Sequence, residues 1–149
     1  MNENGLAPRL SLVTLGVSDV GRARAFYEAL GWRASSASGP EVAFFQLGGV
    51  VLAVWGRDAL ADDANVSPAG DGFRGFALAH NVESEARVDA VLAHAVASGA
   101  RLLKAGRKTE WGGYSGYFAD PDGHIWEVAH NPGFPLDDEG RVVLPEAAP

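Results

Sequence analysis

The chain has 149 residues, of which 47% are hydrophobic and 21% charged, and its formal net charge is −7 at pH 7. This length and composition are typical of one globular domain with a real core, and an acidic chain without clustered Lys and Arg excludes a nucleic-acid surface. The absence of cysteine excludes disulfides, thiolate metal sites and a cysteine nucleophile. No apolar run approaches the ~20 residues of a membrane span, and no signal-peptide pattern opens the chain, so we expect a soluble, cytoplasmic protein.

The first module is predicted to run over residues 9–56, after a loose start at residues 1–8. Its first strand is the β-branched, apolar run up to residue 17. A helix follows, because Ser18 or Asp19 can cap it and apolar residues then recur with helical spacing up to Gly31. A Gly-Gly pair between two apolar runs predicts a hairpin. The strands expected after the helix are residues 32–36, 42–47 and 50–55.

The same pattern repeats after an acidic segment rich in Gly and Pro. This segment, residues 57–74, is predicted to be a linker with one helical turn at residues 59–62. The second module, residues 75–130, opens with a strand up to residue 82. Ser84 is the expected N-cap of a helix that ends at Gly99 and is about one turn longer than the first. Its remaining strands are predicted at residues 101–110, 114–119 and 124–130.

The two modules predict a single α+β domain over residues 1–149, built from tandem βαβββ units. Neither module can cover both faces of its own sheet, so we expect them to pack together. Helices would cover the outer face of a curved mixed sheet, whose other face would surround a cavity. Residues 131–149, with four prolines and four acidic residues, are predicted to be an extended surface tail with residues 142–144 packed down.

The stretch YFADPDGHIWE, residues 117–127, carries the signals of a β-hairpin. Pro121 presets φ for a turn, and Gly123 tolerates a positive φ. Glu127 lies in the middle of the following strand, on the face opposite its two apolar neighbours, because side chains alternate along a strand. A carboxylate there is costly to bury without a partner. Glu127 is therefore a candidate functional residue.

Two motifs and the repeated modules resemble the vicinal oxygen chelate superfamily. The motifs are the opening LVTLGVSDVGRARAFYEALGW and the closing GYFADPDGHIWEVAHNP, and the resemblance covers nearly the whole chain. This superfamily includes glyoxalase I, extradiol dioxygenases, fosfomycin resistance enzymes and bleomycin-binding resistance proteins. The resemblance implies the tandem βαβββ fold, which the superfamily uses for many chemistries.

In the metal-dependent members of this superfamily, the last strand supplies a glutamate ligand that matches Glu127. The resemblance places the other ligand positions at Leu12, Ala53 and Ala77, or at Phe76 if the register shifts by one. Hydrocarbon side chains do not coordinate metals, and one carboxylate does not supply the three or more ligands of a transition-metal site. The chain has four histidines, and their positions in the predicted elements do not direct them toward this carboxylate. They are His80, His94, His124 and His130. We therefore expect neither a metal nor a cofactor.

Tyr117 lies ten residues before Glu127, the spacing that a tyrosine and the metal glutamate have in extradiol dioxygenases. Across a tight hairpin the two side chains would be cross-strand neighbours on one face. The phenol can hydrogen-bond the carboxylate in a partly buried place, or the two groups can form a proton-transfer pair. We favour the first role.

Strand alternation and a Gly-rich segment add further candidates for a cavity. The segment WGGYSG is no phosphate loop, because it lacks the GK[ST] ending and no helix follows it. Aromatic and small residues with a few polar groups suit an organic ligand with a stacking surface. The predicted ligand-binding residues are Thr14, Phe44, Gln46, Trp55, Trp111, Tyr114, Ser115, Tyr117 and Glu127.

Three functions are compatible with these residues. The first, which we favour, is a metal-independent protein that binds an aromatic or cationic small molecule, as bleomycin-resistance-type members do, and the negative net charge would attract a cation. The second is an enzyme of the lyase, isomerase or dioxygenase type, with Glu127 and Tyr117 as an acid–base pair or Glu127 as a metal ligand. The third is an assembly domain with a vestigial cavity. We expect a homodimer whose partner is a small molecule, with no nucleic-acid or membrane partner.

Overall fold

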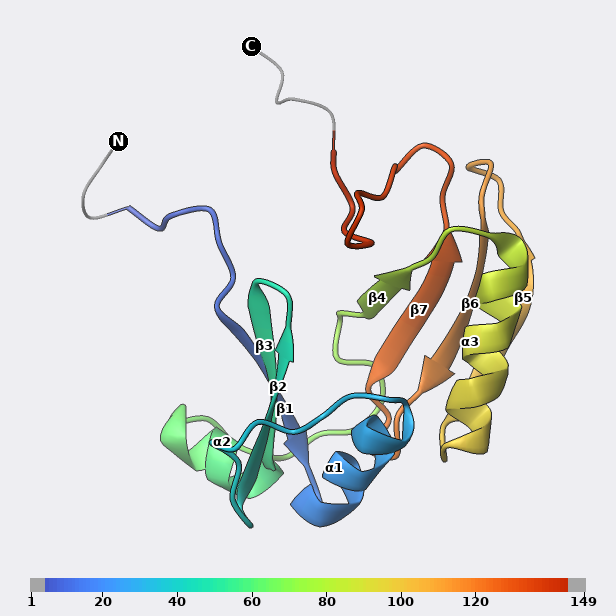
Figure 1. Ribbon diagram of the computed structural model, residues 1–149. Coiled ribbons are helices and arrows are strands. Elements are labelled where there is room, and N and C mark those ends of the chain that lie inside the picture. Colours follow the sequence, from blue (N-terminus) through green and yellow to red (C-terminus); the bar gives the residue numbers. More distant parts are fainter. Residues whose placement is uncertain (1–4, 145–149) are drawn as a thin grey trace. The chain divides into compact units, whose positions relative to one another are not determined.

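The computed structural model describes residues 5–144, and Figure 1 traces its helices and strands. The chain divides into two compact units, which meet in sequence between Gly70 and Asp71. Each unit holds an open mixed sheet with a helix packed on it, and the predicted α+β class is confirmed. Among the described residues, no helix is long and apolar enough to cross a membrane.

The first unit contains five elements in chain order. They are β1 (Leu12–Val17), α1 (Val20–Ala29), β2 (Val42–Leu47), β3 (Val50–Gly56) and α2 (Arg57–Asp63). The sheet has the strand order β1-β3-β2, with β1 parallel and β2 antiparallel to β3. The predicted Gly-Gly hairpin joins β2 to β3, and Gly48 takes a φ of +63° there.

The predicted strand at residues 32–36 does not form. This segment touches the sheet through the N–H of Ser35, which donates to the carbonyl of Phe44 at 2.8 Å. The N–H of Phe44, however, donates to the hydroxyl of Ser38 at 2.9 Å. A side chain from the Ser-rich loop thus takes the hydrogen bond that a neighbouring strand would accept, and the ladder stops. The first module is βαββ, one strand shorter than predicted.

Helix α1 begins and ends where the sequence predicts. The carboxylate of Asp19 accepts a hydrogen bond from the N–H of Arg22 at 3.0 Å, and Gly31 follows the helix with a φ of +114°. Its buried face carries Tyr27, whose ring stacks on Trp32 with a centroid distance of 5.3 Å and lies 6.0 Å from that of Phe45 on β2. This aromatic cluster anchors α1 on one face of the sheet.

Helix α2 contains the helical turn predicted at residues 59–62, and Arg57 fixes the chain that follows it. The guanidinium of Arg57 donates to the carbonyl of Pro68 at 2.7 and 2.9 Å and to that of Gly70 at 3.2 Å. Gly16 lies under the start of this helix, where a Cβ would meet the Arg57 Cα at 3.2 Å. The segment after α2 is therefore tied back to the first unit.

The second unit has the complete βαβββ order. Its elements are β4 (Leu78–Asn81), α3 (Glu85–Ala97), β5 (Arg101–Lys108), β6 (Tyr114–Ala119) and β7 (Ile125–His130). The strand order is β4-β7-β6-β5, with β4 parallel to β7 and the other pairs antiparallel. The hydroxyl of Ser84 caps α3, which has 13 residues against the 10 of α1, and Gly99 ends it with a φ of +115°. These helix predictions are confirmed.

The predicted hairpin between β6 and β7 is present, and a buried carboxylate holds it. Asp120 is 3% exposed, and its Oδ1 accepts hydrogen bonds from the N–H groups of Asp122 and His124 at 2.9 and 2.8 Å. Gly123 takes a φ of +86°, and its N–H donates to the Asp120 carbonyl at 2.9 Å. The turn therefore sets the register that places Tyr117 opposite Glu127.

The tail after β7 is described up to residue 144. Leu136 and Val142 form an isolated antiparallel bridge, and Asp137 accepts hydrogen bonds from the backbone of Glu139 and from the backbone and side chain of Arg141. Residues 142–144 are exposed, so the prediction that they pack down is wrong. The predicted tail beyond residue 144 and the first four residues of the predicted loose start lie outside the described residues.

Gly116→Ala should destabilise the second unit. A Cβ at Gly116 would lie 2.6 Å from Leu92 Cδ1, 2.7 Å from the Lys104 carbonyl oxygen and 2.9 Å from the Gly106 nitrogen. Two of these are backbone atoms of β5, so relief requires the strand to shift, at a cost of about 1–3 kcal/mol. Urea unfolding followed by circular dichroism measures the loss. Gly49→Ala, where nothing lies within 4 Å, should change stability by less than about 0.5 kcal/mol, and equal midpoints for the two variants would contradict the prediction.

Candidate functional site

Tyr117 on β6 and Glu127 on β7 form a hydrogen-bonded pair. They are directly opposite in the antiparallel ladder, and the phenol donates to Glu127 Oε2 at 3.3 Å. The predicted cross-strand hydrogen bond is thus confirmed. The neighbouring Gly116 faces Leu92 of α3, so alternation places Tyr117 and Glu127 on the sheet face opposite this helix. Both side chains are half-buried.

The environment of the pair fixes which group holds the proton. Burial raises the pKa of the Tyr117 phenol, and the charge of Glu127 and the hydrogen bond to it raise this pKa further. The phenol is therefore a neutral donor across the physiological pH range. The pKa of Tyr117 is higher in the folded state than in the unfolded state. The stability that this phenol contributes is therefore fully present below its unfolded-state pKa and is lost as the pH rises through its folded-state pKa.

Small side chains flank Glu127 on the same face, whereas Lys104 of β5 lies opposite Tyr117 on the other side of β6. Ala79 of β4 flanks Glu127 on the side away from Tyr117. Ser115, buried on β6, and its partner Ala129 lie two residues along the ladder. Glu127 therefore has one polar neighbour across β6 and an alanine across β4, and the small side chains leave its carboxylate accessible from the sheet face.

Tyr114 and Trp111 do not lie beside this pair. The phenol of Tyr114 donates to both carboxylate oxygens of Asp89 on α3, at 2.9 and 3.1 Å, so this tyrosine lies on the helix face. Trp111 occupies the turn before β6, where its half-exposed ring lies against Gly113. Of the predicted binding residues in this unit, the structure brings together Ser115, Tyr117 and Glu127 only.

The predicted binding residues of the first unit share one face of its sheet. Thr14 and Phe44 both lie opposite Ala53, from β1 and β2 respectively. Trp55 and Gln46 occupy the same face by alternation, although the Gln46 amide turns back and donates to the Gly48 carbonyl at 2.6 Å. The predicted row is therefore formed within this unit.

The residues at the family's ligand positions do not fit a metal ion. Leu12, Ala53 and Ala77 offer only hydrocarbon, so Glu127 is the one family position with a donor atom. Within residues 5–144, no three His, Asp or Glu side chains come together as a metal site. The donor set is one carboxylate, where a transition metal requires three or more protein ligands.

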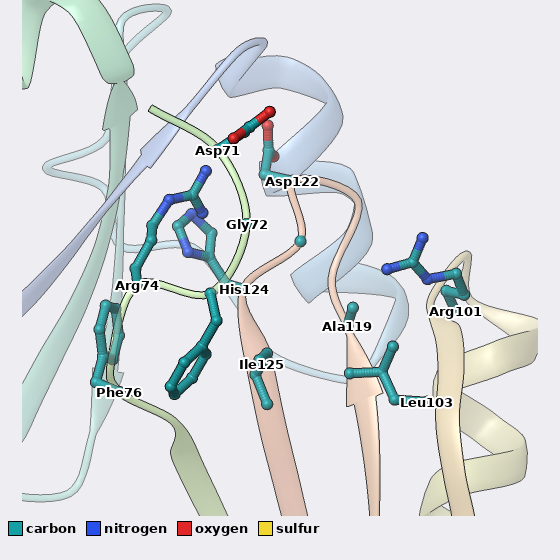
Figure 2. Close-up of a pocket in the computed structure, with 12 residues that line it drawn as sticks. Asp71, Gly72, Arg74, Phe76, Arg101, Leu103, Ala119, Asp122, His124 and Ile125 are labelled. Carbon is teal, nitrogen blue, oxygen red and sulfur yellow. The ribbon is translucent and has the colours of Figure 1, made fainter. Parts of the chain in front are cut away.

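The second unit contains a cavity of about 350 Å³ at the hairpin end of β6 and β7, and Figure 2 shows the residues that line it. Ala119 and Ile125 line it and lie on the same sheet face as Glu127. The segment 71–76 contributes another part of the lining. Sequence reasoning missed this cavity because it assigned residues up to 74 to a linker. The available signal was the aromatic run GFRGF, residues 72–76, which spans the end of this acidic segment and the start of the second module.

Comparison with known proteins identifies the family. The model of the Glyoxalase/Bleomycin resistance protein/Dioxygenase superfamily matches residues 9–128, and the chain belongs to this family. Metallothiol transferase FosB from Shouchella clausii is 32% identical over 117 residues, which cover 78% of this chain and 75% of that protein.

Two solved structures are similar over most of the chain. A glyoxalase-related enzyme from Fulvimarina pelagi is 38% identical with a TM-score of 0.85, over 93% of this chain and 99% of that one. Protein ATC0852 from Agrobacterium tumefaciens is 32% identical with a TM-score of 0.69, over 85% of this chain and 100% of that one. The resemblance inferred from the sequence motifs is confirmed.

Glu127→Gln should lower the pKa of Tyr117. The substitution removes the charge that disfavours the phenolate, while burial still holds the pKa above its ordinary value. The measurement is an NMR titration of ¹³Cζ-labelled tyrosine in a Tyr114→Phe background, which removes the other tyrosine with a raised pKa. Tyr117→Phe assigns the signal. An unchanged Tyr117 pKa in the Glu127→Gln variant would contradict the coupling of the pair.

Proposed function

We propose that this chain binds a small organic molecule with an aromatic ring or a cationic group at the Tyr117–Glu127 pair, without a metal ion. The observation that carries the proposal is the half-buried carboxylate of Glu127, which accepts a hydrogen bond from the Tyr117 phenol on one side and has Ala79 of β4 on the other. Membership of a family whose description includes bleomycin resistance proteins supports this class of function. We also propose that the protein is a cytoplasmic homodimer.

The hydrogen-bonding capacity of Glu127 supports a cationic ligand. A carboxylate offers about four acceptor sites, and among the described residues its one side-chain hydrogen bond comes from Tyr117. Partial burial makes the remaining sites costly to leave without a donor. An ammonium or similar group would supply both donors and charge, and the net charge of −7 adds a weak long-range attraction.

Hydrocarbon side chains at three of the family's ligand positions support binding without a metal. Leu12, Ala53 and Ala77 supply no lone pair to a metal ion. Glu127 matches the glutamate that is a metal ligand in the metal-dependent members of the family. Its carboxylate is then available to an organic donor.

A second candidate is an enzyme, and the names of the relatives favour it. A metallothiol transferase and a glyoxalase-related enzyme are both similar to this chain. The 3.3 Å contact between a phenol and a carboxylate is a geometry for proton transfer, with Glu127 as base and Tyr117 as acid in a lyase or isomerase step. In that case Glu127→Gln would abolish turnover of a substrate whose binding it leaves largely intact.

The test uses 2-naphthylmethylammonium, which combines an aromatic ring with a cation, and protein freed of metal with a chelator. Isothermal titration calorimetry should show saturable binding that Glu127→Gln weakens at least about tenfold, because a charge-assisted hydrogen bond is lost. Tyr117→Phe should weaken binding about two- to fivefold, since the carboxylate remains. The matched control is Glu110→Gln, an exposed glutamate of the turn before β6, which should leave the affinity unchanged.

Two results would overturn the proposed function. One is a stoichiometric divalent ion in the protein as purified, measured by inductively coupled plasma mass spectrometry. The other is equal affinity of the wild-type chain and Glu127→Gln for the cationic probe.

A further inference from the structure

We infer that the cavity at the hairpin end of the second unit is a separate binding site for an aromatic carboxylate, with Arg101 as the residue that binds the anion. The cavity volume of about 350 Å³ lies in the range of small-molecule sites. Neither Tyr117 nor Glu127 lines it. The inference does not depend on the proposed function, because it rests on other residues.

The floor of the cavity is apolar and belongs to the sheet. Ala119 and Ile125 are the ladder pair next to the hairpin, and Leu103 lies beside them on β5. Phe73 and Phe76 line the cavity from the segment before β4 and are 72% and 47% exposed. Exposed aromatic rings beside an apolar floor favour a planar hydrocarbon ligand, because such a ligand would remove their surfaces from water.

The charged groups of the cavity are arranged asymmetrically. In Figure 2, Arg74 lies near Asp71, Asp122 and His124 on one side, so its charge has acidic neighbours. Arg101 lies on the other side, beside Leu103 and Ala119, with no acidic lining residue next to it. Among the described residues, the Arg101 side chain makes neither an ion pair nor a hydrogen bond.

An arginine beside an apolar floor is best suited to bind a planar oxyanion. Its guanidinium offers parallel N–H donors that match a carboxylate in a bidentate manner. One such arginine, with Asp71 and Asp122 on the far side of the cavity, favours a single negative charge over a phosphate dianion, which those carboxylates would repel. The ligand class is therefore a monoanionic aromatic acid, with its ring over Ile125 and its carboxylate at Arg101.

The site is distinct from the Tyr117–Glu127 pair, although both lie on one sheet face. Ala119 and Ile125 stand two residues along the strands from Tyr117 and Glu127, a separation of about 7 Å along the strand. The charge preferences of the two positions are opposite. Probes of the same shape and different charge therefore separate them.

The experiment titrates the 149-residue chain with 2-naphthoate and with its neutral analogue 2-naphthamide by isothermal titration calorimetry. 2-Naphthoate should bind more tightly than 2-naphthamide. Arg101→Gln should lower the affinity for 2-naphthoate at least about tenfold and leave the affinity for 2-naphthamide unchanged. Arg107→Gln, an exposed arginine of the same strand that does not line the cavity, is the matched control and should bind as the wild type does. Phe76→Ala should weaken both probes, because it removes ring contact and leaves the charge.

Three results would overturn the inference. They are equal naphthoate affinities in Arg101→Gln and Arg107→Gln, naphthamide binding as tightly as naphthoate, and loss of naphthoate binding in Glu127→Gln. The last variant also separates the two proposals, since it should weaken the cationic probe alone. Arg101 is exposed on an edge strand, so its substitution should leave the circular dichroism spectrum and the unfolding midpoint unchanged.

Discussion

The register of β6 against β7 is the constraint on which both candidate sites depend. It is set by the turn at residues 120–123, where the buried carboxylate of Asp120 accepts two backbone hydrogen bonds and Gly123 takes a positive φ. A slip of one residue would turn Glu127 toward α3 and separate it from Tyr117. The same slip would remove Ile125 from the floor of the hairpin-end cavity. A structural carboxylate thus positions the candidate functional one.

Local chemistry explains why much of the fold was predictable. Helix caps, glycines after helices and the DPDG turn act over four residues or fewer, so the residue types alone indicate them. The Tyr117–Glu127 pair was predictable for the same reason. A short turn places two residues that are ten apart in sequence directly opposite each other on neighbouring strands. The family motifs are made largely of these signals.

The missed features depend on longer-range or competing interactions. Whether residues 32–36 form a strand depends on the hydroxyl of Ser38, which competes with the ladder for one N–H group. Tyr114 lies three residues before Tyr117, so strand alternation puts it on the helix face. It was predicted as a ligand-binding residue from its Gly-rich context instead. The hairpin-end cavity brings residues 71–76 against β5 and β6, and no periodicity in the sequence reports such a tertiary contact.

The two positions on the second sheet constrain any molecule that would occupy both. In the proposed function Glu127 binds a cation, because the other ligand positions of the family carry hydrocarbon side chains and Tyr117 supplies one donor. Arg101 selects an anion, because no acidic lining residue lies beside it. A single ligand that satisfied both would be a zwitterion with its charges about 7 Å or more apart, the length of two strand residues, and its apolar body over Ile125. Two separate ligands would instead share that residue's surface, so the affinity of each would depend on the other's presence, by the same factor in both directions.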